Sequence, residues 1–183
     1  MRKLNIFNDE NLDNRDVISI LIYIMIISGV FGFIYEEIFY RFDLGYFVKR
    51  GATFGPIIPI YVYGGLLITL FTYRYKNNPM IVFLINFLLT GIFEYFSGYI
   101  ILKIFNLRLW NYNTEILNYF NIDGFVCLRS VLFFAISSLL LIYIIIPFIF
   151  KIYEKYSKNK LYVISYILII IYMLDRISYI LIK

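Results

Sequence analysis

The stretch VISILIYIMIISGVFGFIY at residues 17–35 contains no charged side chain. A helix of about 20 predominantly apolar residues crosses the hydrocarbon core of a bilayer, so this run is long enough to span a membrane. Further apolar runs lie at 57–73, 80–102, 125–150 and 161–182. We predict an all-α bundle of about five transmembrane helices, in which residues 17–183 form one membrane domain and residues 1–16 a polar N-terminal tail.

The composition supports a membrane protein and argues against a soluble one. Hydrophobic residues make up 62% of the 183-residue chain, whereas soluble domains contain about 45–50% apolar residues. A chain of this size has too little interior to bury so much apolar surface away from water. We therefore expect membrane lipid to cover the apolar surface of the chain.

The residue inventory excludes several kinds of site. The chain has no histidine and a single cysteine, Cys127, so it can form neither an intrachain disulfide nor a histidine-dependent catalytic triad. The sequence also lacks a phosphate-binding GxxxxGK[ST] motif and the GxSxG, HExxH and GxGxxG motifs. We expect no enzymatic activity, no cofactor and no metal site.

The net charge of +5 reflects membrane topology rather than nucleic-acid binding, which we do not expect. Lysine and arginine lie in the gaps between the apolar runs, most densely at residues 151–160. Cytoplasmic loops carry the excess of these residues. The chain is therefore predicted to lie in the plasma membrane with its N-terminus in the cytoplasm and its C-terminus outside.

Charged residues inside apolar runs are the strongest candidates for a site. A charge near the middle of a bilayer costs at least ~2.5–3.5 kcal/mol, so it must face protein or water and usually has a partner. Glu94 lies within the third run and Arg129 near the start of the fourth. We predict that these two side chains form an ion pair.

An internal repeat is suggested by two similar segments. GVFGFIYE at 29–36 resembles GIFE at 91–94, and each segment is followed by an aromatic-rich loop and a glycine-led helix start, at 50–56 and 121–130. The chain would then contain two related helical hairpins in parallel orientation plus a fifth helix. By analogy with the predicted Glu94–Arg129 pair, Glu36 should pair with Arg50.

With the N-terminus inside, the buried charges all fall in the outer half of the membrane. They would form one polar cluster, which is either a ligand pocket or a set of ion pairs that only fixes helix register. The predicted cluster consists of Glu36, Arg50, Glu94, Asp123, Arg129, Asp175 and Arg176.

Glycine and proline are concentrated in KRGATFGPIIPIYVYGG at residues 49–65. Irregular backbone at membrane depth survives only where it is buried in protein or lines water. The segment is either a re-entrant start to the second helix or an ordinary loop before a helix that begins with proline. Its backbone motif, together with the glycine of the later loop, comprises Gly51, Gly55, Pro56, Pro59, Tyr61 and Gly124.

These motifs resemble a known family. GFIYE (32–36), KRGATFGPIIPIY (49–61), GIFEY (91–95), RLWNY (108–112) and NIDGFVCLRS (121–130) are similar to the bacterial ABC-transporter type IV (CmpB-like) membrane proteins. The resemblance covers residues 28–150 and implies a permease component that acts with a separate ATPase subunit. The motif positions are occupied by Glu36, Arg50, Gly51, Gly55, Pro56, Pro59, Tyr61, Glu94, Trp110, Tyr112, Asn121, Gly124, Cys127 and Arg129. The sequence departs from the family pattern at Val62-Tyr63 and at Asn111, where aspartate is usual.

Three functions remain open at this point. The first is the permease subunit, although the predicted cytoplasmic loops are shorter than the coupling elements of a conventional ABC permease. The second is a non-transporting sensor or an envelope assembly partner whose ion pairs are purely structural. The third, an intramembrane enzyme using Glu36, Glu94 or Asp175, is disfavoured because neighbouring cations would keep these carboxylates ionised. Five spans make a small pore wall, so conduction would call for a homo-oligomer or a partner.

Overall fold

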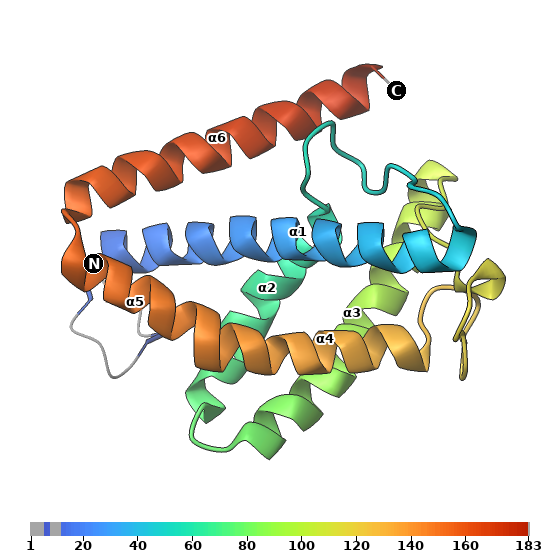
Figure 1. The fold of residues 1–183 in the computed structure, drawn as a ribbon, viewed down its shortest axis with the longest axis horizontal. Helices are drawn as coiled ribbons and strands as arrows, with labels where there is room; N and C mark the ends of the chain where they lie inside the picture. The colour runs from blue at the N-terminus through green and yellow to red at the C-terminus, as the bar shows by residue number, and fades with distance from the viewer. Residues whose placement is uncertain (1–5, 8–11, 183) are drawn as a thin grey trace.

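The computed structural model describes residues 6–7 and 12–182, and within them all regular secondary structure is helical (Figure 1). The long helices are α1 (Asn14–Leu44), α2 (Pro59–Thr72), α3 (Pro79–Phe105), α4 (Leu128–Leu140), α5 (Ile146–Lys155) and α6 (Lys158–Ile182). Three short segments lie between them: η1 (Tyr73–Tyr75), η2 (Tyr112–Thr114) and the π-helical η3 (Leu141–Ile145). The predicted all-α bundle is confirmed.

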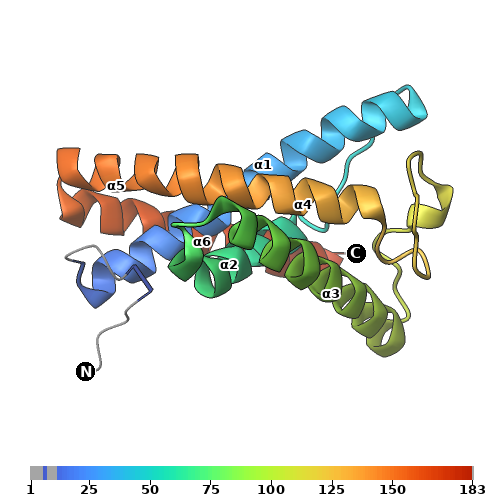
Figure 2. The same ribbon diagram turned by 90° about the horizontal axis from the view of Figure 1, so that it is seen from below.

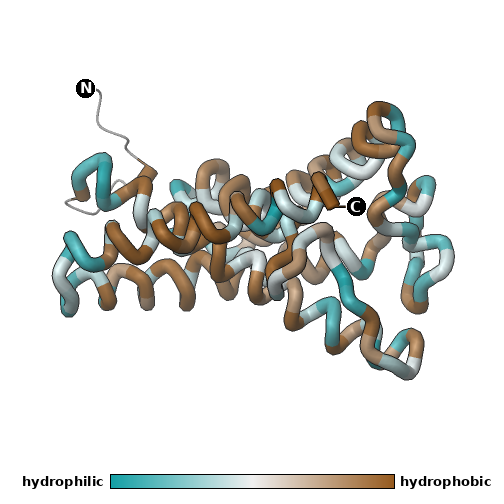
Figure 3. The backbone as a smooth tube through the Cα atoms, turned by 90° about the horizontal axis from the view of Figure 1, so that it is seen from above, coloured by the Kyte–Doolittle hydropathy of each residue, from teal (hydrophilic) through white to brown (hydrophobic). Residues whose placement is uncertain are grey.

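Four helical segments in the described part of the chain are long and apolar enough to cross a membrane, namely α1, α3, α6 and the continuous segment Leu128–Lys155. The second run is different, because α2 has 14 residues and is roughly 21 Å long, short of a hydrocarbon core of about 30 Å. Apolar residues dominate the helices, and polar ones gather toward the ends of the bundle (Figure 3).

Helix α1 extends well beyond the predicted end at Tyr35. Its start is fixed by a capping box between Asp13 and Asp16, and its end by Gly45 at a φ of 81°, a backbone conformation that glycine adopts without strain. The apolar run predicts an end at Tyr35, directly before Glu36. That boundary is wrong because Glu36 lies inside the protein with a cationic partner, so the carboxylate does not end the helix.

Helix α2 begins deep in the bundle. The Ile58 N–H donates to the carbonyl of Gly29 at 3.2 Å, and at about 1.5 Å per residue roughly 22 Å of α1 separates Gly29 from Leu44. Residues 45–58 therefore return alongside α1 without helical structure before α2 starts (Figure 1). This path fits a re-entrant start, while α2 also begins with Pro59, as the other alternative predicts; residues 45–58 are called the re-entrant segment below. The irregular segment 45–58 together with α2 makes up the second pass along the bundle.

The two hairpins α1–α2 and α3–α4 pack through equivalent contacts. A Cβ atom on Gly29 would meet Val62, the fourth residue of α2, at 2.5 Å. A Cβ atom on Gly91 would meet Val131, the fourth residue of α4, at 3.3 Å. A small residue on the first helix of each hairpin thus admits a valine at the same position of the second helix.

This register aligns GVFGFIYE (29–36) with GIFEYFSG (91–98). Gly32 then corresponds to Glu94, and Glu36 corresponds to Gly98. The two carboxylates are therefore not equivalent, as the repeat analogy assumed, but lie about one helical turn apart. The hairpins are related in fold while each places its carboxylate at its own height.

Helices α4 and α5 form one nearly continuous rod (Figure 2), which is joined by the π-helical segment η3. Pro147 follows this segment and has no N–H to offer the preceding turn. The rod covers Leu128–Lys155 instead of the predicted 125–150, because Phe125 lies in a turn, Val126 in an isolated β-bridge, and Cys127 caps the helix.

The apolar core and the polar cavity occupy different ends of the bundle. Buried apolar side chains near the N-terminal end of α1 pack with α2 and α5 around Val17, Ile20, Ile68 and Ile146. At this end Lys158 bonds to Asp16 at 2.7 Å and fastens α6 to α1. The opposite end, where α1 and α6 finish, contains the polar cavity.

Candidate functional site

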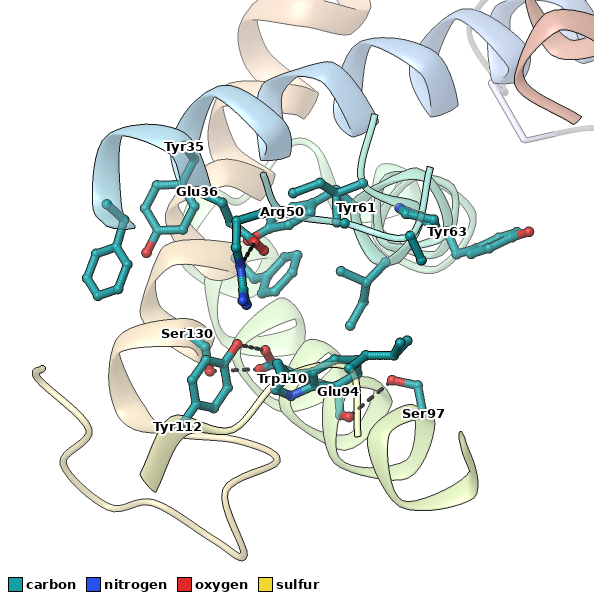
Figure 4. A pocket seen from close by; sticks show the side chains of 18 of the residues that line it. Tyr35, Glu36, Arg50, Tyr61, Tyr63, Glu94, Ser97, Trp110, Tyr112 and Ser130 are labelled. Carbon is teal, nitrogen blue, oxygen red and sulfur yellow. Dashed lines mark hydrogen bonds and ion pairs between the residues drawn. The ribbon is translucent and has the colours of Figure 1, made fainter. Parts of the chain in front are cut away.

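A cavity of about 390 Å³ lies where α1, α3 and α6 end and α2 and α4 begin. This volume falls in the range of roughly 300–1,000 Å³ that is typical of small-molecule sites. In Figure 4, Glu36, Arg50 and Tyr61 lie on one side of the cavity and Glu94, Trp110, Tyr112 and Ser130 on the other. The cavity therefore lies between the two related hairpins.

The first ion pair joins the re-entrant segment to α1. Arg50 Nε lies 3.2 Å from Glu36 Oε2, and Arg50 Nη2 donates to the hydroxyl of Tyr40 at 2.9 Å. The guanidinium also lies over the Tyr40 ring, 4.0 Å from its centroid. The sequence prediction that Glu36 contacts Arg50 matches this geometry.

The second ion pair joins α4 to the loop before it. Arg129 Nη2 lies 2.5 Å from Glu115 Oε2, and the two side chains are 14% and 6% exposed. Arg129 Nη1 also donates to Tyr35 at 3.2 Å. The predicted Glu94–Arg129 pair is thus wrong. Successive helical residues point about 100° apart, so Ser130 faces Glu94 while Arg129 turns toward Glu115.

Glu94 has only hydroxyl partners. Its Oε2 accepts from Ser130 Oγ at 2.7 Å, and its Oε1 accepts from the hydroxyl of Tyr112. The residue is 2% exposed. Among the described residues, no lysine or arginine forms an ion pair with it.

Tyr40 links the two ion pairs. Its hydroxyl donates to Glu115 and accepts from Arg50, so one polar network runs from α1 through both loops to α4. Burial raises the pKa of Glu115, although the Tyr40 hydrogen bond and the charges of Arg129 and Arg50 lower it. Burial, with Glu94 close by, likewise raises the pKa of Tyr112 well above its ordinary value.

The other predicted cluster residues are divided between the cavity and its surroundings. Arg176 lines the cavity and donates to the carbonyl of Ala52. Asp175 does not line it but accepts from the N–H groups of Phe54 and Gly55 at 2.8 and 3.0 Å, which ties the re-entrant segment to α6. Asp123 is exposed outside the cavity, where it accepts from Tyr95 at 3.1 Å.

The backbone motif shapes the cavity walls. Gly51, Pro59 and Tyr61 line the cavity, and Gly51 has a φ of 88°, which suits glycine. Gly55 and Pro56 line a separate, more open depression. Gly124 has a φ of 74° and no room for a Cβ atom beside Asn111.

Sequence reasoning missed Tyr35, Tyr40, Glu115 and Ser130 as cavity residues. Tyr40 follows Glu36 by one helical turn, a spacing that places both on one face of a helix. Glu115 carried no comparable signal, because it lies in a polar loop whose path no periodicity predicts.

A second cavity of about 30 Å³ lies next to the first. Tyr61 and Phe134 line both cavities, and their rings stack with centroids 5.0 Å apart. Ser28, Gly65 and Ser137 line the smaller cavity. Two stacked rings therefore separate the large cavity from a small, mostly apolar space in which Ser28 and Ser137 are the serines.

The comparisons with known proteins identify the chain at the level of its family. A model of the family described as "Putative ABC-transporter type IV" matches residues 22–180. The chain belongs to this family. Neither the search of curated proteins nor the search of solved structures found a match. All cavity-lining residues, from Tyr35 to Tyr179, fall inside the segment shared with the ABC-transporter type IV family.

The cavity lining offers charged groups, hydroxyl groups and aromatic rings. In the described part of the chain, no group of three histidine, cysteine, aspartate or glutamate residues is arranged for a metal ion. Ion pairs, hydroxyls and aromatic rings line the space. Such a lining can orient a small polar solute by hydrogen bonds and charge.

Proposed function

We propose that the protein is a permease-type component of a membrane transport complex and that the cavity between its hairpins holds the transported solute. The position of the cavity is the observation that carries this proposal. Transporters built from internal repeats bind substrate at the repeat interface, commonly beside broken helices. Here the re-entrant start of α2 borders a cavity that both hairpins line.

The stacked rings of Tyr61 and Phe134 are the proposed inner gate. A permease must open its site to each side of the membrane in turn. The smaller cavity beyond these rings marks the route inward, past Ser28 and Ser137. A sensor or an assembly protein would need the large cavity but no route beyond it.

Labelling of introduced cysteines tests this route. In a Cys127→Ser background, Ser137→Cys places a thiol in the smaller cavity, whereas Ser138→Cys places one at a fully buried position outside it. We expect a membrane-impermeant cationic thiol reagent to modify Ser137→Cys from the side opposite the large cavity and to leave Ser138→Cys unmodified. If Ser137→Cys resists the reagent on both sides of the membrane, the permease proposal fails and the sensor alternative is favoured.

We propose a separate ATPase as the energy source, because the family is described as "Putative ABC-transporter type IV" and this sequence has no phosphate-binding loop. Docking would use the end where α2 meets α3 and α5 meets α6. Affinity purification of the tagged protein from its own host membranes in mild detergent should yield a nucleotide-binding subunit. If no nucleotide-binding subunit copurifies, the proposed ATPase partner is wrong, whereas the proposed solute site is unaffected. We assign no catalytic step to this chain.

A further inference from the structure

Glu94 differs from the two other carboxylates that line the cavity. Glu36 and Glu115 are each paired with an arginine, whereas the partners of Glu94 are two hydroxyl groups. Burying a carboxylate is costly unless a cation or a proton neutralises it. Because no described cation pairs with Glu94, a proton is the remaining means of neutralising it inside the protein.

The hydrogen atoms around Ser130 allow both states of Glu94. A serine hydroxyl has one hydrogen to donate and two lone pairs to accept with. Ser130 Oγ lies 2.7 Å from Glu94 Oε2 and 2.9 Å from the Cys127 carbonyl, and it accepts from the Cys127 N–H at 3.2 Å. When Glu94 is ionised, Ser130 donates to the carboxylate. When Glu94 is protonated, the carboxyl donates to Ser130, which turns its hydrogen to the Cys127 carbonyl.

No heavy atom has to move between these two states. The Cys127 carbonyl keeps the N–H of Val131 at 3.2 Å in either case, so it is not left unsatisfied when Ser130 turns away. Tyr112 donates to the other carboxylate oxygen throughout. The change amounts to the rotation of one hydroxyl.

The charged and titratable groups that face Glu94 come from every neighbouring element. Two of these groups are charged, Arg129 and Glu36. Arg129 is paired with Glu115, and Glu36 is paired with Arg50. The groups that interact with Glu94 include Glu36 of α1, Tyr61 of α2, Tyr112 of the loop and Arg129 of α4. None of them holds Glu94 in its ionised form through a direct ion pair.

We propose that Glu94 is a reversible proton-binding site of the cavity, with Ser130 as the hydroxyl that switches between its two states. A proton from cavity water adds to Glu94 Oε2, and the carboxylate becomes a neutral carboxyl. The charge of the cavity thereby rises by one unit without a change of shape. Protons should compete with any cationic group that binds near Glu94. This site exists whether or not the chain transports a solute.

Infrared difference spectroscopy tests the site on the full-length protein in lipid. On acidification from about pH 8 to about pH 5, a range within reach of buried carboxyls, the wild type should gain a carbonyl band from a protonated carboxyl. Glu94→Gln should lack that band. Glu154→Gln, which removes an exposed carboxylate on α5, should keep it. Ser130→Ala should shift the band because one hydrogen-bond partner is lost, and Ser130→Thr should restore it.

Two results would overturn the proposal. The first is an identical difference spectrum for the wild type and for a Glu94→Gln variant that is shown to be folded. The second is an unchanged spectrum together with a rise in melting temperature on adding choline that Glu94→Gln abolishes. That outcome would make Glu94 a permanently ionised site for an ammonium group.

Discussion

At the scale of single residues, the polar end of the bundle is organised by two ion pairs, each between a glutamate carboxylate and an arginine guanidinium. The Glu115–Arg129 pair is nearly buried and is linked through Tyr40 to the Glu36–Arg50 pair. Removing one member of a buried pair leaves an uncompensated charge, which is far more costly than removing both. The network therefore makes a direct energetic prediction.

Arg129→Gln should destabilise the protein by about 3–5 kcal/mol, because it leaves Glu115 buried without a cation. Glu115→Gln should also destabilise it, and the double variant should be less destabilised than the sum by roughly 0.5–3 kcal/mol. Reversible unfolding in mixed detergent micelles measures these differences. A cycle with Glu94→Gln in place of Glu115→Gln serves as the comparison and should show a smaller coupling. Equal coupling energies in both cycles would mean that Glu94 is also a direct partner of Arg129.

At the scale of helices, close packing at glycine holds each hairpin together. Gly64 and Gly65 are neighbours on α2 but face different surroundings. A Cβ atom on Gly64 would meet Phe134 at 3.5 Å, which is an ordinary contact, whereas one on Gly65 would lie 2.6 Å from Ser28 Cβ. Gly65 is thus a point of close approach between α1 and α2.

Gly65→Ala should destabilise the protein by about 1–3 kcal/mol through overpacking. Gly64→Ala should be neutral or stabilising by up to ~1 kcal/mol, because alanine favours a helix more than glycine does. Thermal unfolding in detergent distinguishes the two variants. Similar melting temperatures would mean that α1 and α2 do not approach as closely as described.

How much of these elements the sequence predicts depends on how local each signal is. Apolar length alone places α1, α3, α4–α5 and α6 to within a few residues at most boundaries. The end of α1 is not predicted by apolar length, because the helix continues through Glu36, whose partner Arg50 lies in the following loop. The partner of Arg129 was missed because Glu115 lies in a loop, whose path depends on tertiary contacts. Even the correct Glu36–Arg50 contact came from a repeat alignment that is off by one turn.

At the scale of the whole molecule, one end of the bundle contains the polar cavity and the other contains the packed apolar core. Helix α1 begins at the packed end and α6 finishes near the hollow end (Figure 1). The lysines of residues 151–160 lie at the packed end with the start of α6. The positive-inside rule then favours a cytoplasmic packed end and an outward-facing cavity.

Reporter fusions check this orientation. Alkaline phosphatase, which is active only outside the cytoplasm, should be active when fused after residue 183 and inactive when fused into the 74–79 turn. A green fluorescent protein should show the opposite pattern, because it matures in the cytoplasm. The reverse pattern in both reporters would mean that the orientation is inverted and that the cavity faces the cytoplasm.

The central claim is that the end of the bundle contains a water-accessible polar cavity between the two hairpins. Phe96 and Ser97 are neighbours on α3, but Phe96 is 54% exposed on the apolar surface and Ser97 lines the cavity. The deciding measurement is the rate at which a charged thiol reagent modifies Ser97→Cys and Phe96→Cys in membranes, in a Cys127→Ser background. The account predicts rapid modification of Ser97→Cys and none of Phe96→Cys, because a thiol in hydrocarbon does not ionise. Modification of Phe96→Cys alone would place the cavity wall against lipid and contradict the site.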